Sequence, residues 1–190
     1  METLVAKVTF EHFDGPAAHR LRDLVGEIDQ DARADKVEAG SVFDSLDEFL
    51  RRFDAYVQRT GFDLVLAHLD GQPVGQAWGW PLGADTGWWR GLDPEPEPGF
   101  TREDGHRTFA FSELMVRQGA AGQGIGHALH DELLAGRTEQ RATLLVRPEN
   151  TTAYQAYRRW GWRKAAELRP AVAHAPLMDV LILPLPLGSA

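Results

Sequence analysis

The hydrophobic and polar residues follow two different periods, and the period changes several times along the chain. Residues 4–10 ("LVAKVTF") alternate and are rich in β-branched side chains, which predicts a first strand. Between Pro16 and Ile28 the apolar residues recur at helical spacing, with proline in the first turn, which predicts a helix. A second helix is predicted from Ser45 to Gly61, because a capping-box start precedes a single apolar stripe and a glycine ends it.

The middle of the chain predicts a hairpin followed by a long loop. Two strand-like runs flank Asp70-Gly71, a dipeptide that readily takes the positive φ angles of a tight turn. Residues 81–106 then lack any periodicity and contain Trp88, Trp89 and the run "PEPEP". A loop of this length is either functional or mobile. It is interpreted either as a surface insertion whose tryptophans pack onto the core or as an acidic lid with aromatic walls.

The second half of the chain alternates strands with helices. Strands are predicted over residues 107–117, 142–147, 161–168 and 177–185, and helices over 124–135 and 150–160. No internal repeat and no shift in composition marks a second domain. The order of elements therefore predicts an α/β fold in a single domain over residues 1–190.

Composition narrows the class of protein. A chain of 190 residues that is 43% hydrophobic can build a substantial core. The absence of cysteine excludes a disulfide scaffold, a thiolate nucleophile and a Cys-based zinc site, and favours a reducing, cytoplasmic location. The formal net charge of -8 disfavours nucleic acid as a partner. No apolar stretch is long enough to span a bilayer and the start lacks a signal-peptide pattern, so no membrane association is expected.

A glycine-rich loop precedes the helix predicted from residue 124. The start of a helix has unpaired N–H groups and the positive end of the helix dipole, so an anion is stabilised there. Glycines at 122, 124 and 126 lack the Cβ atoms that would keep a bulky phosphate away. The stretch "GAAGQGIGHA" has neither the lysine of a P-loop nor the glycine spacing of a dinucleotide fingerprint. The pattern predicts a pyrophosphate site, with a ligand-free connection between strand and helix as the alternative.

Two motifs follow one another in this part of the sequence. In "ELMVRQGAAGQGIGHALHDELL" a strand with an apolar-x-Val end leads into the glycine loop and a helix. In "ATLLVRPENTTAYQAYRRWGW" an Asn follows a strand, and a helix with an Ala and a Tyr precedes Gly161-Trp162. Over roughly residues 108–165 the chain resembles the GNAT superfamily of acyl-CoA-dependent N-acetyltransferases. It departs from the family at Ala121, where a Gln or Arg is usual, and Arg117, Gln123 or His127 could compensate.

The resemblance implies a fold, an activity and a set of cofactor contacts. The fold would be a single mixed, largely antiparallel central sheet with helices on both faces. The activity would be transfer of the acetyl group of acetyl-CoA to a primary amine by direct attack in a ternary complex, with Tyr157 protonating the departing thiolate. The cofactor-binding residues would be Leu114, Met115, Val116, Ala121, Gly122, Gln123, Gly124, Ile125, Gly126, His127, Asn150 and Ala153.

The residue types near these motifs suggest how an acceptor amine is handled. Glu113 alternates with Phe111 and Met115 in the predicted strand and therefore projects from the same face. Burial there would raise its pKa, so that Glu113 acts as a base or binds the cation; the alternative is a glutamate that is paired with an arginine. A cationic amine could also be received through charge and cation–π contact by Asp29, Trp78, Trp88 and Trp89.

Two functions in different classes remain open. The first is an active N-acetyltransferase whose partner is a small-molecule or peptide amine. The second is a catalytically weak or inactive CoA-binding regulatory or interaction protein on the same fold, which the departure at Ala121 makes plausible. A homodimer is left open. No metal is expected, because His127 and His130 with Asp131 lie at the wet edge of a helix without a further ligand cluster.

Overall fold

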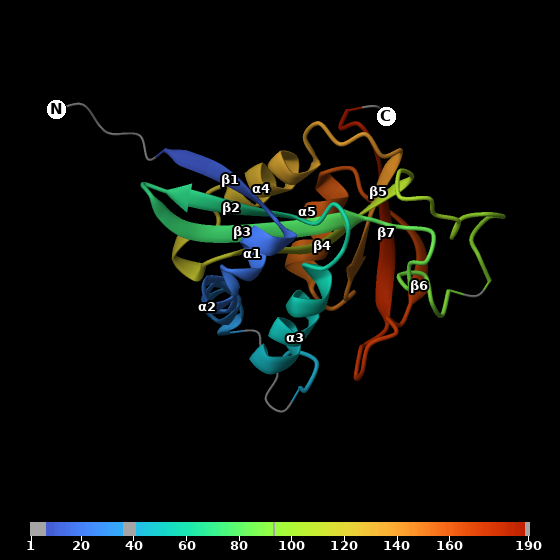
Figure 1. Ribbon diagram of the computed structural model, residues 1–190, viewed down its shortest axis with the longest axis horizontal. Helices are drawn as coiled ribbons and strands as arrows, with labels where there is room; N and C mark the ends of the chain where they lie inside the picture. Colours follow the sequence, from blue (N-terminus) through green and yellow to red (C-terminus); the bar gives the residue numbers. More distant parts are fainter. Residues whose placement is uncertain (1–6, 36–40, 93, 189–190) are drawn as a thin grey trace. The chain divides into compact units, whose positions relative to one another are not determined.

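A computed structural model describes residues 7–35, 41–92 and 94–188 of the chain (Figure 1). The described residues divide into two compact units. The first unit is drawn from Met1–Trp80 and Glu113–Ala135, and the second from Pro81–Ser112 and Gly136–Ala190. Strand β4 (Thr108–Val116) begins in the second unit and ends in the first. The single-domain organisation stays a prediction.

Three antiparallel strands form the start of the first unit. These are β1 (Val8–Asp14), β2 (Asp63–Leu69) and β3 (Gln72–Pro81), with β1 paired to β2 and β2 to β3. The predicted turn at Asp70-Gly71 is confirmed, with φ angles of 50° and 81°. Of the predicted first strand, residues 4–6 lie outside the described part of the chain, and Lys7 is not part of β1. The strand instead extends to Asp14, because it pairs with β2 along the whole length of that strand.

The predicted helix from Pro16 to Ile28 is two helices, α1 (Gly15–His19) and α2 (Arg22–Arg33). The side chain of Asp14 caps α1 by accepting a hydrogen bond from the N–H of Ala17 at 2.9 Å. The break falls at Leu21, whose φ of −96° and ψ of 12° lie outside the helical region. Because α2 then continues to Arg33, Asp29 and Arg33 come to lie one turn apart on the same face.

The second predicted helix is confirmed as α3 (Leu46–Tyr56), although it is shorter than expected. The hydroxyl of Ser45 accepts a hydrogen bond from the N–H of Glu48 at 3.3 Å, which is the predicted start. The helix ends at Tyr56, before Gly61.

Helices of the first unit cover both faces of its strands (Figure 1). Neighbouring residues on a strand point to opposite faces, as Gly75 and Gln76 do on β3. A Cβ atom on Gly75 would lie 2.9 Å from Leu129 of α4 (Ile125–Leu134). The side-chain amide of Gln76 instead donates to the carbonyl of Val25 in α2 at 3.0 Å. Helix α4 therefore packs on one face, and α2 lies on the other.

The second unit contains the start of β4, three further strands and one helix. These elements are β5 (Arg141–Val146), α5 (Thr151–Arg159), β6 (Arg163–Leu168) and β7 (Met178–Pro184). Strands β5 and β6 both pair with β7 in antiparallel register, whereas β4 runs parallel to β5. Among the described residues the β4–β5 register ends at Ala110↔Thr143, although both strands continue.

The strand order β1-β2-β3-β4-β5-β7-β6 makes a seven-stranded, mostly antiparallel mixed sheet. The predicted fold class is therefore confirmed. Residues 82–92 and 94–107 contain turns and bends but neither helix nor strand, so the predicted long loop is also confirmed. Among the helices in the described ranges, none combines the length and the apolar character that crossing a membrane requires.

Candidate active site

The glycine-rich loop follows a short 3₁₀ turn, η1 (Gln118–Ala120), and leads into α4 within the first unit. Gly122 and Gly124 have φ angles of 77° and 81°, which glycine adopts without the steric cost of a side chain. Gly124 is the N-cap of α4, and this helix start has no side-chain cap. The first helical hydrogen bond runs from the N–H of Ala128 to the carbonyl of Gly124 at 3.0 Å. The backbone shape of the loop therefore requires the first two glycines, whether or not a phosphate binds there.

The residues predicted to hold a cofactor around this loop differ in exposure. Residues 121–124 are exposed, whereas Ile125 is buried. Of the residues that could compensate for Ala121, Arg117 is already engaged, because its Nε donates to the carbonyl of Pro73 at 3.0 Å. Gln123 and His127 lie beside the helix start, where their side chains can reach a ligand from solvent.

The end of β4 is held by β3 and α2. The N–H of Arg117 donates to the carbonyl of Val74 on β3 at 2.8 Å, and the N–H of Gln118 donates to Asp31 of α2 at 2.9 Å. Met115 is buried, and its sulfur lies 3.1 Å from the side-chain amide nitrogen of Gln76. Leu114 and Val116 on either side of it are half-buried. These contacts fix β4 relative to α2.

Arg33 of α2 lies among three carboxylates in the first unit. Its Nε is 2.6 Å from Asp29, its Nη1 is 3.7 Å from Asp44, and its Nη2 donates to Glu113 at 3.2 Å. We call Asp29, Arg33, Asp44 and Glu113 the carboxylate cluster. The side chains of Asp29 and Asp44 are only 4% and 8% exposed, whereas those of Arg33 and Glu113 are 26% and 24% exposed. The cluster is therefore reached from solvent at Arg33 and Glu113.

Burial raises the pKa of Glu113, and the positive charge of Arg33 opposes this effect without cancelling it. The pKa of Asp29 is raised for the same reason, again with Arg33 in opposition. The direction agrees with what burial was expected to do, and Glu113 is also paired with an arginine. Its role towards an amine stays a prediction. The sequence analysis missed Arg33. Its spacing of four residues from Asp29 was a signal, but nothing local links it to Glu113, 80 residues later.

The prediction that Trp78 contacts the acceptor needs correction. Trp78 is 1% exposed and packs against Phe49 and Phe53 of α3, at centroid distances of 5.7 Å and 5.2 Å. Its indole ring therefore belongs to the hydrophobic core of the first unit, because the face of β3 that carries it is covered by α3. The indole N–H has no hydrogen-bond partner among the described residues.

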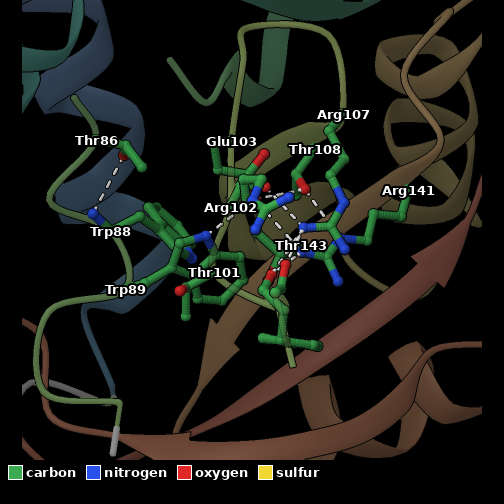
Figure 2. A network of polar contacts seen from close by, with 12 residues as sticks. Thr86, Trp88, Trp89, Thr101, Arg102, Glu103, Arg107, Thr108, Arg141 and Thr143 are labelled. Atoms are coloured by element: carbon green, nitrogen blue, oxygen red, sulfur yellow. Dashed lines mark hydrogen bonds and ion pairs between the residues drawn. The ribbon is translucent and has the colours of Figure 1, made fainter. Parts of the chain in front are cut away.

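Trp89 is also buried, at 6% exposure, in the second unit. Its indole N–H donates to Glu103 at 3.0 Å, and Glu103 also accepts from Thr108 at 2.8 Å and from Arg141 at 3.4 Å (Figure 2). Trp89 packs edge-on against Phe100 at 5.2 Å. These contacts anchor the long loop to β4 and β5, as the surface-insertion interpretation expected. A substrate-contact role for Trp89 is corrected, since its polar group is used internally.

Trp88 differs from its neighbour. Its side chain is half-buried, and its backbone N–H donates to the hydroxyl of Thr86 at 3.2 Å (Figure 2). A contact between Trp88 and an acceptor stays a prediction.

Helix α5 carries the remaining predicted residues, in the second unit. The side chain of Asn150 caps the helix by accepting from the N–H of Ala153 at 3.4 Å. Tyr157 is half-buried one turn beyond Ala153, and its ring meets Phe111 edge-on at 6.4 Å. Tyr154 is committed elsewhere, because its hydroxyl donates to Asp179 at 2.8 Å. Of the two tyrosines, Tyr157 remains the better candidate for a proton donor.

One group on α4 has the composition of a metal site. Single ligand atoms of His127, His130 and Asp131 lie within 4.8 Å of one another. The expectation that His130 lies at the wet edge of the helix is wrong, because His130 is 1% exposed, and its Nδ1 is 2.8 Å from Asp131. Burial lowers the pKa of His130, with Asp131 in opposition. The contact between His130 and Asp131 within α4 explains this geometry without an ion. The absence of a metal from the function stays a prediction.

Comparison with known proteins adds a family and several similar structures. A family model described as Acetyltransferase (GNAT) family matches residues 27–162, more than half of the chain. No curated protein matches the sequence.

Similar solved structures share the fold at low identity. An acetyltransferase from Thermus thermophilus is 15% identical over 94% of this chain and 97% of that chain, with a TM-score of 0.62. The yncA protein of Salmonella typhimurium with its cofactor acetyl-CoA is 17% identical over 97% of each chain, with a TM-score of 0.58. A mutant of the spermidine N-acetyltransferase SpeG from Vibrio cholerae is 12% identical over 93% of each chain, with a TM-score of 0.56.

Proposed function

Because the chain belongs to the Acetyltransferase (GNAT) family, we propose that it moves the acetyl group of acetyl-CoA to a primary amine of a small molecule or peptide. The observation that carries the proposal is the start of α4, which has no side-chain cap and follows two glycines in left-handed conformation. Such a helix start presents N–H groups and the positive end of the dipole to an anion. A diphosphate would be stabilised at such a helix start.

The chain's own residues would hold acetyl-CoA through the backbone. The N–H groups of residues 122–126 would bind the pyrophosphate, and the main chain of Leu114 and Val116 would bond the pantetheine amides as a neighbouring strand would. Both segments belong to the first unit. Asn150 and Ala153 of the second unit are assigned to the same cosubstrate by the sequence motif alone. Bound acetyl-CoA supplies an activated acyl group, so the chain needs no nucleophile of its own.

Two side chains would handle protons. When the amine nitrogen forms its bond to the acetyl carbon, the bond from that carbon to sulfur breaks, and the hydroxyl of Tyr157 would donate a proton to the sulfur. A phenol suits this role because it stays protonated at neutral pH. Glu113 would bind the incoming ammonium or accept its proton. Its raised pKa makes it a better base than an ordinary glutamate while Arg33 holds it in place.

A second candidate is a CoA-binding protein without catalysis. Ala121 is exposed at the head of the loop, where the family's usual Gln or Arg would contact the phosphates. Weaker binding of the cosubstrate would follow from its loss. A homodimer and a cytoplasmic location stay predictions alongside either function.

Release of CoA thiol from acetyl-CoA, measured with a panel of primary amines, tests the proposal. We expect turnover with at least one amine, saturable CoA binding by calorimetry, and a large loss of turnover in Tyr157→Phe. CoA binding without turnover for any amine would support the second candidate. No heat on addition of CoA to folded protein would contradict both.

A further inference from the structure

The carboxylate cluster carries an internal positive charge where an incoming amine would bind. Three carboxylates, those of Asp29, Asp44 and Glu113, surround the guanidinium of Arg33. Arg52 is the second positive charge nearby, since its charge acts on the pKa of both Asp29 and Glu113. With all five groups ionised, three negative and two positive charges leave one net negative charge. One ammonium ion neutralises these five groups, and a second would make their sum positive.

The geometry places Arg33 directly beside the carboxylate of Glu113. Arg33 and Glu113 are each about a quarter exposed, whereas Asp29 and Asp44 are almost fully covered. A cation that arrives from solvent therefore meets Glu113 and Arg33 together, because Nη2 of Arg33 lies 3.2 Å from the carboxylate oxygen of Glu113. At such short range in a partly buried site, repulsion between like charges is strong.

Arg33 is held where it is. Its Nε and Nη1 face Asp29 and Asp44, and its guanidinium carbon lies 5.7 Å from the ring centre of Phe49. Helix α2 itself is bonded to η1 through the carboxylate of Asp31 and to β3 through the carbonyl of Val25. Moving Arg33 aside would break ion pairs with two nearly buried carboxylates, so the guanidinium is a fixed part of the site.

The hydrogen-bonding character of Arg33 agrees with this charge pattern. A guanidinium is a donor only. A polar group that reaches Arg33 is therefore favoured when it accepts hydrogen bonds, as an oxygen does, and disfavoured when it is a second ammonium.

We propose that Arg33 is a specificity-determining residue that restricts the acceptor to amines with a single positive charge near the reacting nitrogen. The ammonium that is to be acetylated pairs with Glu113, and Arg33 repels a second ammonium on the same molecule. This inference rests on the proposed acetyltransferase function. It sets the chain apart from acetyltransferases that act on polyamines.

A matched pair of acceptors tests the inference. Diaminobutane carries two ammonium groups, and aminobutanol of the same length carries a hydroxyl in place of the second one. We expect the wild-type protein to have the higher kcat/KM for aminobutanol. In Arg33→Gln the ratio of kcat/KM should shift towards diaminobutane by about ten-fold or more, because the repelling charge is lost. Arg33→Lys keeps the charge and should keep the wild-type preference.

Two controls separate specificity from damage to the fold. Circular dichroism and calorimetry with CoA show whether each variant is folded and binds the cosubstrate. The wild-type preference alone also decides the matter if Arg33→Gln does not fold, since a wild-type protein that prefers diaminobutane contradicts the inference.

The outcomes distinguish this inference from the function on which it rests. Thiol release with an unchanged ratio in folded Arg33→Gln overturns the role of Arg33 and leaves the acetyltransferase function intact. No thiol release with any amine overturns both.

Discussion

The guanidinium of Arg33 donates to the carboxylate of Glu113 at 3.2 Å, so a cation from α2 reaches a strand residue 80 positions later in the sequence. The contact gives Glu113 a fixed orientation next to the part of β4 that we propose binds the cosubstrate. Burial nevertheless raises the pKa of this carboxyl, with Arg33 in opposition. Glu113 is therefore a paired carboxylate that takes up a proton more readily than an exposed glutamate does.

The first prediction concerns the pH dependence of activity. Protonated Glu113 can neither bind an ammonium nor accept its proton, so wild-type kcat/KM should rise as the pH rises through its raised pKa. The midpoint of this rise should lie above pH 4.5, the usual pKa of a glutamate side chain. Glu113→Gln should lose this rise, and its kcat/KM should be lower by roughly 10² or more if Glu113 acts as a base. The same rise in Glu113→Gln as in the wild type would exclude this role.

The second prediction concerns stability and pH. The pKa values of Glu113 and Asp29 are higher in the folded protein than the usual values. At a pH between the usual pKa and the raised pKa, the folded state therefore binds more protons than the unfolded state. The contribution of these groups to the free energy of unfolding is therefore full below the unfolded pKa and is lost as the pH rises through the folded one. Denaturant unfolding from about pH 4 to about pH 8 should show a smaller decline in Glu113→Gln. A difference between variant and wild type that does not vary with pH would contradict the shift.

The third prediction compares the two tyrosines of α5. Tyr157→Phe keeps the ring that packs against Phe111 but removes the hydroxyl, so kcat should fall by roughly 10²-fold or more while CoA affinity is unchanged. Tyr154→Phe removes the hydrogen bond to Asp179 instead. It should keep its activity and lose about 1 kcal/mol of stability. Equal kcat values for the two variants would remove Tyr157 from the mechanism.

The fourth prediction tests the glycine loop. Gly124→Ala places a Cβ on a residue with φ of 81°, which should cost roughly 1–2 kcal/mol and disturb the start of α4. CoA affinity, measured by calorimetry, should fall with it. Gly119→Ala is the matched control, because a Cβ there meets nothing within 4 Å and the residue has no positive φ. If both variants bind CoA like the wild type, the helix start is not the diphosphate site.

The fifth prediction concerns the anchor of the long loop. The side chain of Glu103 is fully buried and pairs with Arg141, while Trp89 and Thr108 also donate to it. Glu103→Gln removes the negative charge beside Arg141 and should cost about 3 kcal/mol of stability. Proteolysis within residues 82–107 should become faster as well. Glu97→Gln alters an exposed residue of the same loop and should change neither quantity. Unchanged protection in Glu103→Gln would show that other contacts of the loop hold it in place.

Local sequence determined the elements whose signals act over a few residues. The turn at Asp70-Gly71 follows from the positive φ angles that these residues tolerate. The starts of α3 and α5 follow from the short side chains of Ser45 and Asn150, which bond to N–H groups three residues on. The start of α4 follows from the left-handed backbone conformation of Gly124 and not from a side-chain cap. Each signal and its partner lie within one turn of chain.

Tertiary structure decided which side chains meet and which are covered. The same composition that made Trp78 and Trp89 look like binding-site walls also suits a core, and the packing of α3 and of the long loop buried both. Arg33 reaches Glu113 only because α2 continues past the predicted end and is tied to β4. The sequence by itself therefore determined most of the elements and the glycine loop, and its resemblance to the GNAT family predicted the sheet class. The charge balance around Glu113 depended on long-range packing, because residues 80 positions apart carry no local signal of each other.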